Sequence, residues 1–179
     1  HSLPLTHVVA LAQDAGVPAM GAASILGLIS GFSIASRLGN GILADRIGGK
    51  KAIALALAIQ GASILMLLLV RDLWAFYLFA FVFAVGYGGE MVIFPVINRQ
   101  YYGSAPIGTI YGFQMLGANL GMAAGGYLGG MLFDLTGSYT AAIWAASAIG
   151  FAGMASALRL ASPLPQRAKA PSVSGGSRS

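Results

Sequence analysis

Long apolar stretches alternate with short polar ones along this chain, and this pattern predicts helices that cross a membrane. Apolar residues dominate six stretches, at about 1–13, 18–40, 51–70, 73–98, 107–133 and 139–160. Five of them reach the roughly 20 residues that a helix needs to span the hydrocarbon core of a bilayer. The first is shorter, and we interpret it as the end of a helix whose beginning is missing. The pattern therefore predicts an all-α membrane bundle over residues 1–160, with a truncated first helix.

The composition agrees with a membrane protein and excludes several other classes. Hydrophobic residues make up 57% of the chain and charged residues only 8%, against roughly 25% charged residues in soluble domains. The chain has no cysteine, which excludes disulfides and thiolate metal sites. We expect neither a metal nor a cofactor. A membrane enzyme would need clustered catalytic groups, which two histidines and one acid inside a predicted helix do not supply.

The basic residues are distributed unevenly between the two ends of the predicted helices. Only Arg71 lies at the end opposite to the 41–51 segment. Eight lie at the same end as that segment: Arg46, Lys50, Lys51, Arg99, Arg159, Arg167, Lys169 and Arg178. Since cytoplasmic loops are enriched in Lys and Arg, the 41–51 segment and a disordered polar tail over 161–179 are predicted to be cytoplasmic, on the inner membrane. This placement explains the net charge of +5 better than nucleic-acid binding does.

The segment from Gly41 to Lys51 is charged and rich in glycine, and we predict a tight turn at the membrane surface. Its charged residues could act as a conformational latch. The Asp45 carboxylate can accept hydrogen bonds from the N-terminus of a partner helix, where the helix dipole favours an anion. Arg46, Lys50 and Lys51 can hold carbonyls or carboxylates of another bundle, while Gly41 and Gly48 shape the turn. The alternative is a simple turn that only sets the topology.

The same segment resembles the short loop signature of the major facilitator superfamily, G-x-L-a-D-r-x-G-r-r-r. The matching residues are Gly41, Leu43, Ala44, Asp45, Arg46 and Gly48; Lys50 and Lys51 keep the charge, and Gly49 departs. In that family the signature lies between helices two and three and again between eight and nine. Three predicted helices and a tail follow here, so the resemblance implies helices seven to twelve of a twelve-helix carrier. It also implies a missing N-terminal half as partner.

Three further details resemble the oxalate/formate antiporter and monocarboxylate transporter branch. His7 is followed by Asp14-Ala15-Gly16 as at the end of that branch's seventh helix, and Arg37 precedes Gly41 by four residues, where these carriers place an anion-binding arginine. The 86–89 run Gly-Tyr-Gly-Gly resembles their tenth-helix glycine cluster. Two positions depart from the branch. Ser33 stands where carriers of this branch often have an aspartate. The 107–133 stretch contains no lysine, whereas the dicarboxylate antiporter has one in this helix, so the resemblance implies a monoanion rather than oxalate as the substrate.

Arg37 is the leading candidate for binding the substrate. A guanidinium stays charged, and a charge inside the membrane normally faces a bundle interior or a watery cavity. Ser30, Ser33, Arg37 and Asn40 recur at helical spacing on one face, which gives a polar stripe that could bind a carboxylate through both oxygens. Alternatively, Arg37 lies about one turn from the surface and extends to the cytoplasm along its own stem.

Two residues are candidates for carrying a coupled proton. Glu90 is the only acid inside a predicted helix, and it shares a face with Tyr87, which we include in the substrate site. A buried carboxylate can bind a proton in one conformation and release it in another; the alternative is a structural ion pair. His7 is the other candidate, because imidazole is the side chain suited to proton exchange at physiological pH. It could equally be a polar residue that caps its helix.

The 107–133 stretch contributes two more candidates and a glycine ladder. Tyr111 and Gln114 share a face that could line the cavity. Gly117, Gly121, Gly125 and Gly129 recur every four residues, a spacing that lets helices approach closely in a membrane. Taken together, the sequence predicts half of a secondary transporter that moves a small organic anion by alternating access, as proton symport or anion exchange. The alternative is a membrane receptor or assembly module that does not transport.

Overall fold

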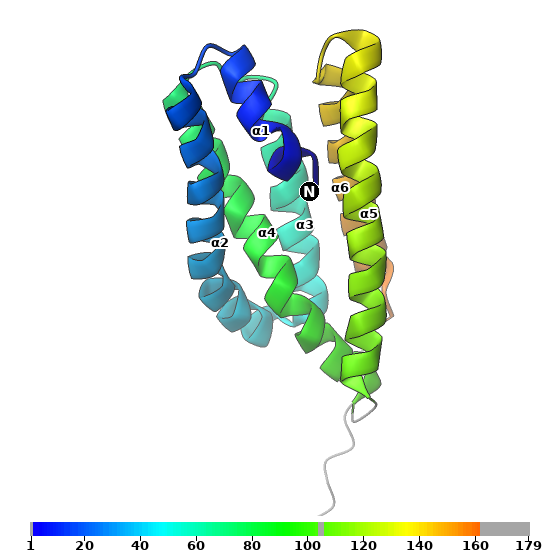
Figure 1. Cartoon of the computed structure of the whole chain (residues 1–179). Helices are drawn as coiled ribbons and strands as arrows, with labels where there is room; N and C mark the ends of the chain where they lie inside the picture. The colour runs from blue at the N-terminus through cyan, green and yellow to red at the C-terminus, as the bar shows by residue number, and fades with distance from the viewer. Residues whose placement is uncertain (1, 104–105, 162–179) are drawn as a thin grey trace, which may run out of the picture.

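A computed structural model describes residues 2–103 and 106–161, and these residues form six α-helices and no strand (Figure 1). The helices are α1 (Ser2–Asp14), α2 (Ala19–Ile47), α3 (Gly49–Met66), α4 (Leu73–Tyr102), α5 (Ile107–Thr136) and α6 (Thr140–Arg159). The predicted all-α class and the number of helices are confirmed. The predicted tail beyond residue 161 lies outside the described residues.

Polar and glycine residues mark the helix ends where the chain turns. The Asp72 carboxylate caps the start of α4 by accepting a hydrogen bond from the Ala75 N–H at 2.9 Å, which satisfies one of the free donors at a helix N-terminus. Gly48 and Gly137 end α2 and α5 with φ of +86° and +66°, angles that a side chain makes unfavourable. Each donates its N–H to the carbonyl four residues earlier.

Helix α4 is the centre of the bundle and packs against both α2 and α3, while α3 also packs against α6. Glycines make these contacts close. A Cβ at Gly86 would lie 2.8 Å from the Ala56 carbonyl oxygen on α3, and a Cβ at Gly88 would overlap the backbone of Ser33 on α2. The α3–α6 contact uses Gly61 and Gly150 in the same way. The predicted 86–89 glycine cluster is therefore where α4 meets its two neighbours.

Helix α5 is packed much more sparsely than the others, and Gly129 is its only buried residue among those described. Figure 1 shows α5 running alongside α6 at one side of the bundle. In the upper part of the picture, α1 lies between this pair and α2. Only part of the glycine ladder packs against another helix. Gly125 and Gly129 contact α1, whereas Gly117 and Gly121 have no neighbouring atom within 4 Å of a Cβ position.

The structure differs from the sequence prediction mainly in the lengths of the helices. Helix α2 continues to Ile47 rather than ending near residue 40, so most of the segment predicted as a turn is helical and the break is confined to Gly48. The charged, glycine-rich segment from Gly41 suggested an earlier end, but glycine is tolerated inside membrane helices. Helix α4 likewise runs through Pro95 to Tyr102.

Four of the described helices, α2, α3, α4 and α6, are long and apolar enough to cross a membrane. The sequence predicted five full spans, and α5 is the difference. It has 30 residues, but eight of them are glycine, which lowers its hydropathy without adding charge. The chain is a multi-pass membrane protein.

Candidate functional site

Arg37 lies on the exposed side of α2, deep within the helix. Eight residues separate it from Asp45, the first charged residue towards the end of α2, which is about 12 Å along the axis. From the last residue of α2, Ile47, it is nearly three turns away, roughly 15 Å. The sequence predicted that α2 ends near residue 40, so Arg37 lies further from the end of its helix than expected.

The predicted polar stripe on α2 is divided between two environments. Ser33 and Asn40 are buried, with 3% and 8% exposed, and the Asn40 Nδ2 donates to a backbone carbonyl of α4 at 2.9 Å. Ser30 and Arg37 are exposed. The four residues cover roughly 80° of the helix circumference at 100° per residue, and α4 covers one edge of that arc. Ser33 therefore packs between helices, while Arg37 and Ser30 lie on the exposed part of that arc.

Helix α4 positions Tyr87 and Glu90 one turn apart at the centre of the bundle. The Tyr87 ring stacks on Phe83, with ring centroids 5.8 Å apart and an interplanar angle of 11°. This stacking fixes the direction of the half-buried phenol. Glu90 is buried, with 8% exposed, which agrees with the expectation of an acid inside the bundle.

On α5, the predicted cavity residue Gln114 is engaged by a neighbouring helix. The side-chain amides of Gln114 and Asn98 form a reciprocal pair, with N–H···O distances of 2.8 and 3.0 Å. Asn98 on α4 is fully buried, so this pair fixes α5 to α4 through two hydrogen bonds in an apolar setting. Tyr111, one turn before Gln114, is half-buried.

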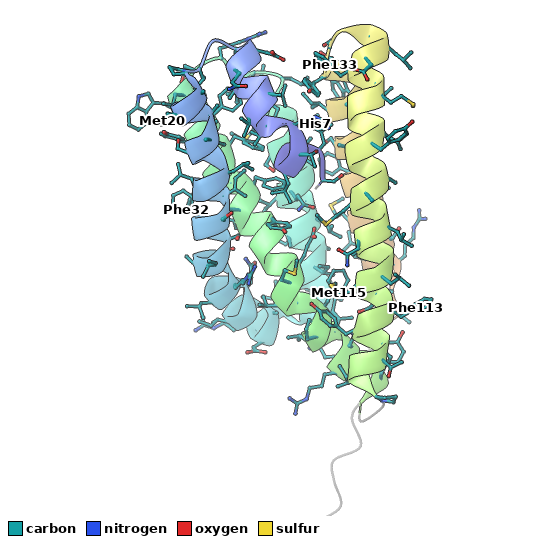
Figure 2. The ribbon with its side chains drawn as sticks, viewed as in Figure 1. His7, Met20, Phe32, Phe113, Met115 and Phe133 are labelled. Atoms are coloured by element: carbon teal, nitrogen blue, oxygen red, sulfur yellow. The ribbon has the colours of Figure 1, made fainter. Side chains whose placement is uncertain are left out.

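His7 joins α1 to α5 and to the start of α6 (Figure 2). Its Nε2 lies 3.1 Å from the Gly126 carbonyl oxygen, and its Nδ1 lies 3.3 Å from the Tyr139 hydroxyl. A carbonyl can only accept, so Nε2 carries the hydrogen and Nδ1 accepts from the phenol. Burial, with smaller contributions from Asp14 and Asp134, raises the pKa of Tyr139, which keeps the phenol protonated as this donor. A neutral His7 thus has both ring nitrogens satisfied.

At the opposite end of the bundle, the predicted latch residues differ in what they contact. The Lys50 ammonium donates to the Leu160 carbonyl at the end of α6, a favourable place for a cation because of the helix dipole. Asp45, Arg46 and Lys51 are exposed. Lys50 therefore binds within this bundle, whereas the other three remain available to another surface.

Sequence reasoning missed two buried side-chain amides, those of Asn98 and Gln60. Asn98 lies next to Arg99 and was taken as the end of its helix rather than as a core residue. Gln60 is 3% exposed in the middle of α3, in a stretch that carries no charge. An isolated amide in a span is a signal that could have identified it, because polar groups inside a membrane are costly.

Comparison with known families agrees with this arrangement of helices. The sequence profile of the Major Facilitator Superfamily matches residues 2–178. The chain belongs to the major facilitator superfamily.

Similar proteins of this superfamily come from bacteria and from fish. The chain is 36% identical over 117 residues to the uncharacterized MFS-type transporter YttB of Bacillus subtilis, covering 64% of this chain and 29% of that protein. It is 27% identical over 128 residues to the 4-hydroxybenzoate transporter PcaK of Acinetobacter baylyi, covering 72% and 28%. It is 29% identical over 168 residues to monocarboxylate transporter 12-B of Danio rerio, covering 89% and 34%. The matched part of the chain spans about a third of the length of these superfamily transporters.

Proposed function

We propose that this chain is the C-terminal half of a secondary active transporter that moves a small organic anion across the membrane by alternating access. Within the superfamily, we place it closest to the oxalate/formate antiporter and monocarboxylate transporter branch. The partner is an N-terminal six-helix half, which would cover the exposed side of α2. The substrate site would lie between the two halves and include Arg37, Ser30, Ser33, Tyr87, Tyr111 and Gln114.

The observation that carries this proposal is the exposed position of Arg37 on a helix long enough to span a membrane, nearly three turns from the end of that helix. An arginine there needs an aqueous cavity or an anion, because burying an isolated charge in hydrocarbon is costly. Its planar guanidinium can bind both oxygens of a carboxylate. The names of two relatives, a 4-hydroxybenzoate and a monocarboxylate transporter, are those of carriers for carboxylates. The absence of a lysine from α5 favours a monoanion.

Glu90 is the group that we assign to the coupled proton, which makes proton symport the leading mode and anion exchange the other. It is the one acid that is both inside a spanning helix and buried among the described residues. His7, the other candidate, is better suited to packing, because both of its ring nitrogens are engaged by α5 and Tyr139. Proton-driven uptake by variants of Glu90 and of His7 would show which of the two residues carries the coupled proton.

The proposal is tested by uptake of labelled monocarboxylates into proteoliposomes that contain the full-length carrier. Saturable uptake that an acid-outside proton gradient accelerates supports proton symport, and uptake that depends on internal anion supports exchange. Binding of anions without uptake, either with a proton gradient or with internal anion, would instead favour a receptor. Absence of both binding and uptake for a panel of monocarboxylates would remove the proposed substrate class.

Asp45→Asn is expected to slow transport about tenfold while leaving anion affinity unchanged. Asp45 lies in the last turn of α2, where the helix dipole disfavours an anion, so the carboxylate does not stabilise its own helix. An exposed acid in that place is suited to accept hydrogen bonds from the other half in one transport state. The measurement compares turnover with Kd, and Asp134→Asn, an exposed acid at the far end of α5, is the control. A loss of affinity with normal turnover would contradict the latch.

A further inference from the structure

The contact between α3 and α4 buries a polar side chain that the proposed mechanism does not yet use. Gly86 on α4 lies against Gln60 on α3: a Cβ at Gly86 would be 3.0 Å from the Gln60 backbone nitrogen and 3.1 Å from its Cβ. The two helices are therefore as close here as their backbones allow. Gln60 is 3% exposed in a stretch that contains no charged residue from Ala52 to Met66.

The side-chain amide of Gln60 is a donor without an acceptor. Its Nε2 is buried and has no hydrogen-bond partner among the described residues. The neighbouring Ser63 hydroxyl binds the backbone carbonyl of Gln60, at 2.7 Å, and leaves the side chain alone. A buried donor without an acceptor destabilises the folded state, so leucine would be the more stable residue here if the amide had no role.

Helix geometry places Glu90 on the side of α4 that faces this donor. It follows Gly86 by four residues, so it lies on the same side of α4 one turn further along. Side chains on a helix lean towards its N-terminus. Because α3 and α4 are joined by a short turn and run in opposite directions, the Gln60 side chain leans towards the level of Glu90 and Glu90 leans back towards Gln60. The carboxylate offers about four lone-pair positions, so it can accept from Gln60 in addition to any other partner.

We propose that Gln60 is a positioning residue for Glu90, and that its Nε2–H donates to the Glu90 carboxylate in the transport state in which the coupled proton has left. This inference rests on the proposed role of Glu90 in coupling. No covalent step is involved: the proton leaves Glu90, and the amide stabilises the resulting charge. When Glu90 is protonated, its carbonyl oxygen is a weaker acceptor than the carboxylate, so the deprotonated state is the one that fixes α3 to α4 more firmly.

Few other titratable or charged groups are near enough to replace this donor. Among the helices packed against α4, α3 brings no charge between Ala52 and Met66, and the first half of α5 brings only Tyr111. Helix α2 brings Arg37, which is exposed. On α4 itself, Tyr87 precedes Glu90 by one turn. Gln60 is thus the one buried side-chain amide that α3 presents to α4.

The test is Gln60→Leu in the full-length carrier, made both in the wild-type background and with Glu90→Gln. Removing the donor disfavours the charged carboxylate, so the pH midpoint of proton-driven uptake should move up by about one unit. The melting temperature of the purified carrier should show the same upward shift in its pH dependence. Both shifts should be absent with Glu90→Gln. Ser63→Ala, a small change at the same buried level of α3, should leave the midpoint unchanged.

The two measurements separate this inference from the proposed function. The pH dependence of the melting temperature can be measured without transport. If its midpoint depends on Glu90 and moves with Gln60→Leu, the Gln60–Glu90 pair is supported even if uptake proves independent of pH. The inference is overturned if Gln60→Leu leaves both midpoints in place, or if the shift persists in the Glu90→Gln background. If Gln60→Leu does not fold, Gln60→Met, which keeps the length of the side chain without its donor, is subject to the same outcomes.

Discussion

Arg37→Gln in the full-length carrier is expected to weaken anion binding by at least about 100-fold, the largest effect on function among these substitutions. Truncating one partner of a desolvated charge pair typically costs 2–5 kcal/mol or more, and each 1.4 kcal/mol is a factor of ten in Kd. Arg37→Lys keeps the charge but loses the planar fork that binds two oxygens, and we expect about a tenfold loss. The measurement is anion Kd in detergent or nanodiscs.

The control for this experiment is Arg71→Gln, which removes an exposed cation in the turn between α3 and α4 and should leave Kd unchanged. An arginine that only extends to the membrane surface predicts a different pattern. Lysine would then substitute freely, because its stem also reaches the interface, and glutamine would have a mild effect. Wild-type affinity in Arg37→Lys together with mild weakening in Arg37→Gln would remove Arg37 from the site.

Gly88→Ala is expected to have the largest effect on folding. A Cβ at this position would overlap the Ser36 hydroxyl and the backbone of Ser33 on α2. The serine hydroxyl can rotate, but the backbone cannot move without separating α2 from α4. Overpacking of this kind costs about 1–3 kcal/mol or more, so we expect a lower melting temperature and less monodisperse protein in fluorescence-detected size exclusion.

Gly117→Ala on α5 is the matched control, because nothing lies within 4 Å of its Cβ position among the described residues. Alanine is favoured over glycine inside a helix by about 1 kcal/mol, so this variant should be neutral or slightly more stable. If Gly88→Ala were as stable as Gly117→Ala, the close approach of α2 to α4 would be wrong.

The sequence predicted the helices well because they are apolar stretches between polar turns. The hydropathy of such a stretch can be read from its residues without knowing how the helices pack. It predicted the end of α2 poorly, because the charged, glycine-rich segment from Gly41 looks like a loop, although glycine is tolerated inside membrane helices. This error changed the interpretation of Arg37, whose distance from the end of α2 depends on where the helix ends.

Individual candidate residues were harder to predict than the helices. A face of α2 could be recognised from spacing, but not which edge of that face α4 would cover, and so Ser33 was grouped with Arg37. Likewise, residue type made Gln114 a candidate for the cavity, but it could not show that Gln114 also pairs with Asn98 of another helix. Such pairings depend on the relative rotation of the helices, which one sequence does not determine.

The sparse packing and low hydropathy of α5 have a consequence for how the protein is made. Entry of a helix into the bilayer from the translocation channel depends on its own transfer free energy, and α5 falls below the level that α2, α3, α4 and α6 reach. Its insertion should therefore depend on help from helices already in the membrane. The Asn98–Gln114 amide pair offers such help, since α4 emerges from the ribosome just before α5. On this basis, Asn98 would contribute to the yield of inserted protein before it contributes to any property of the finished carrier.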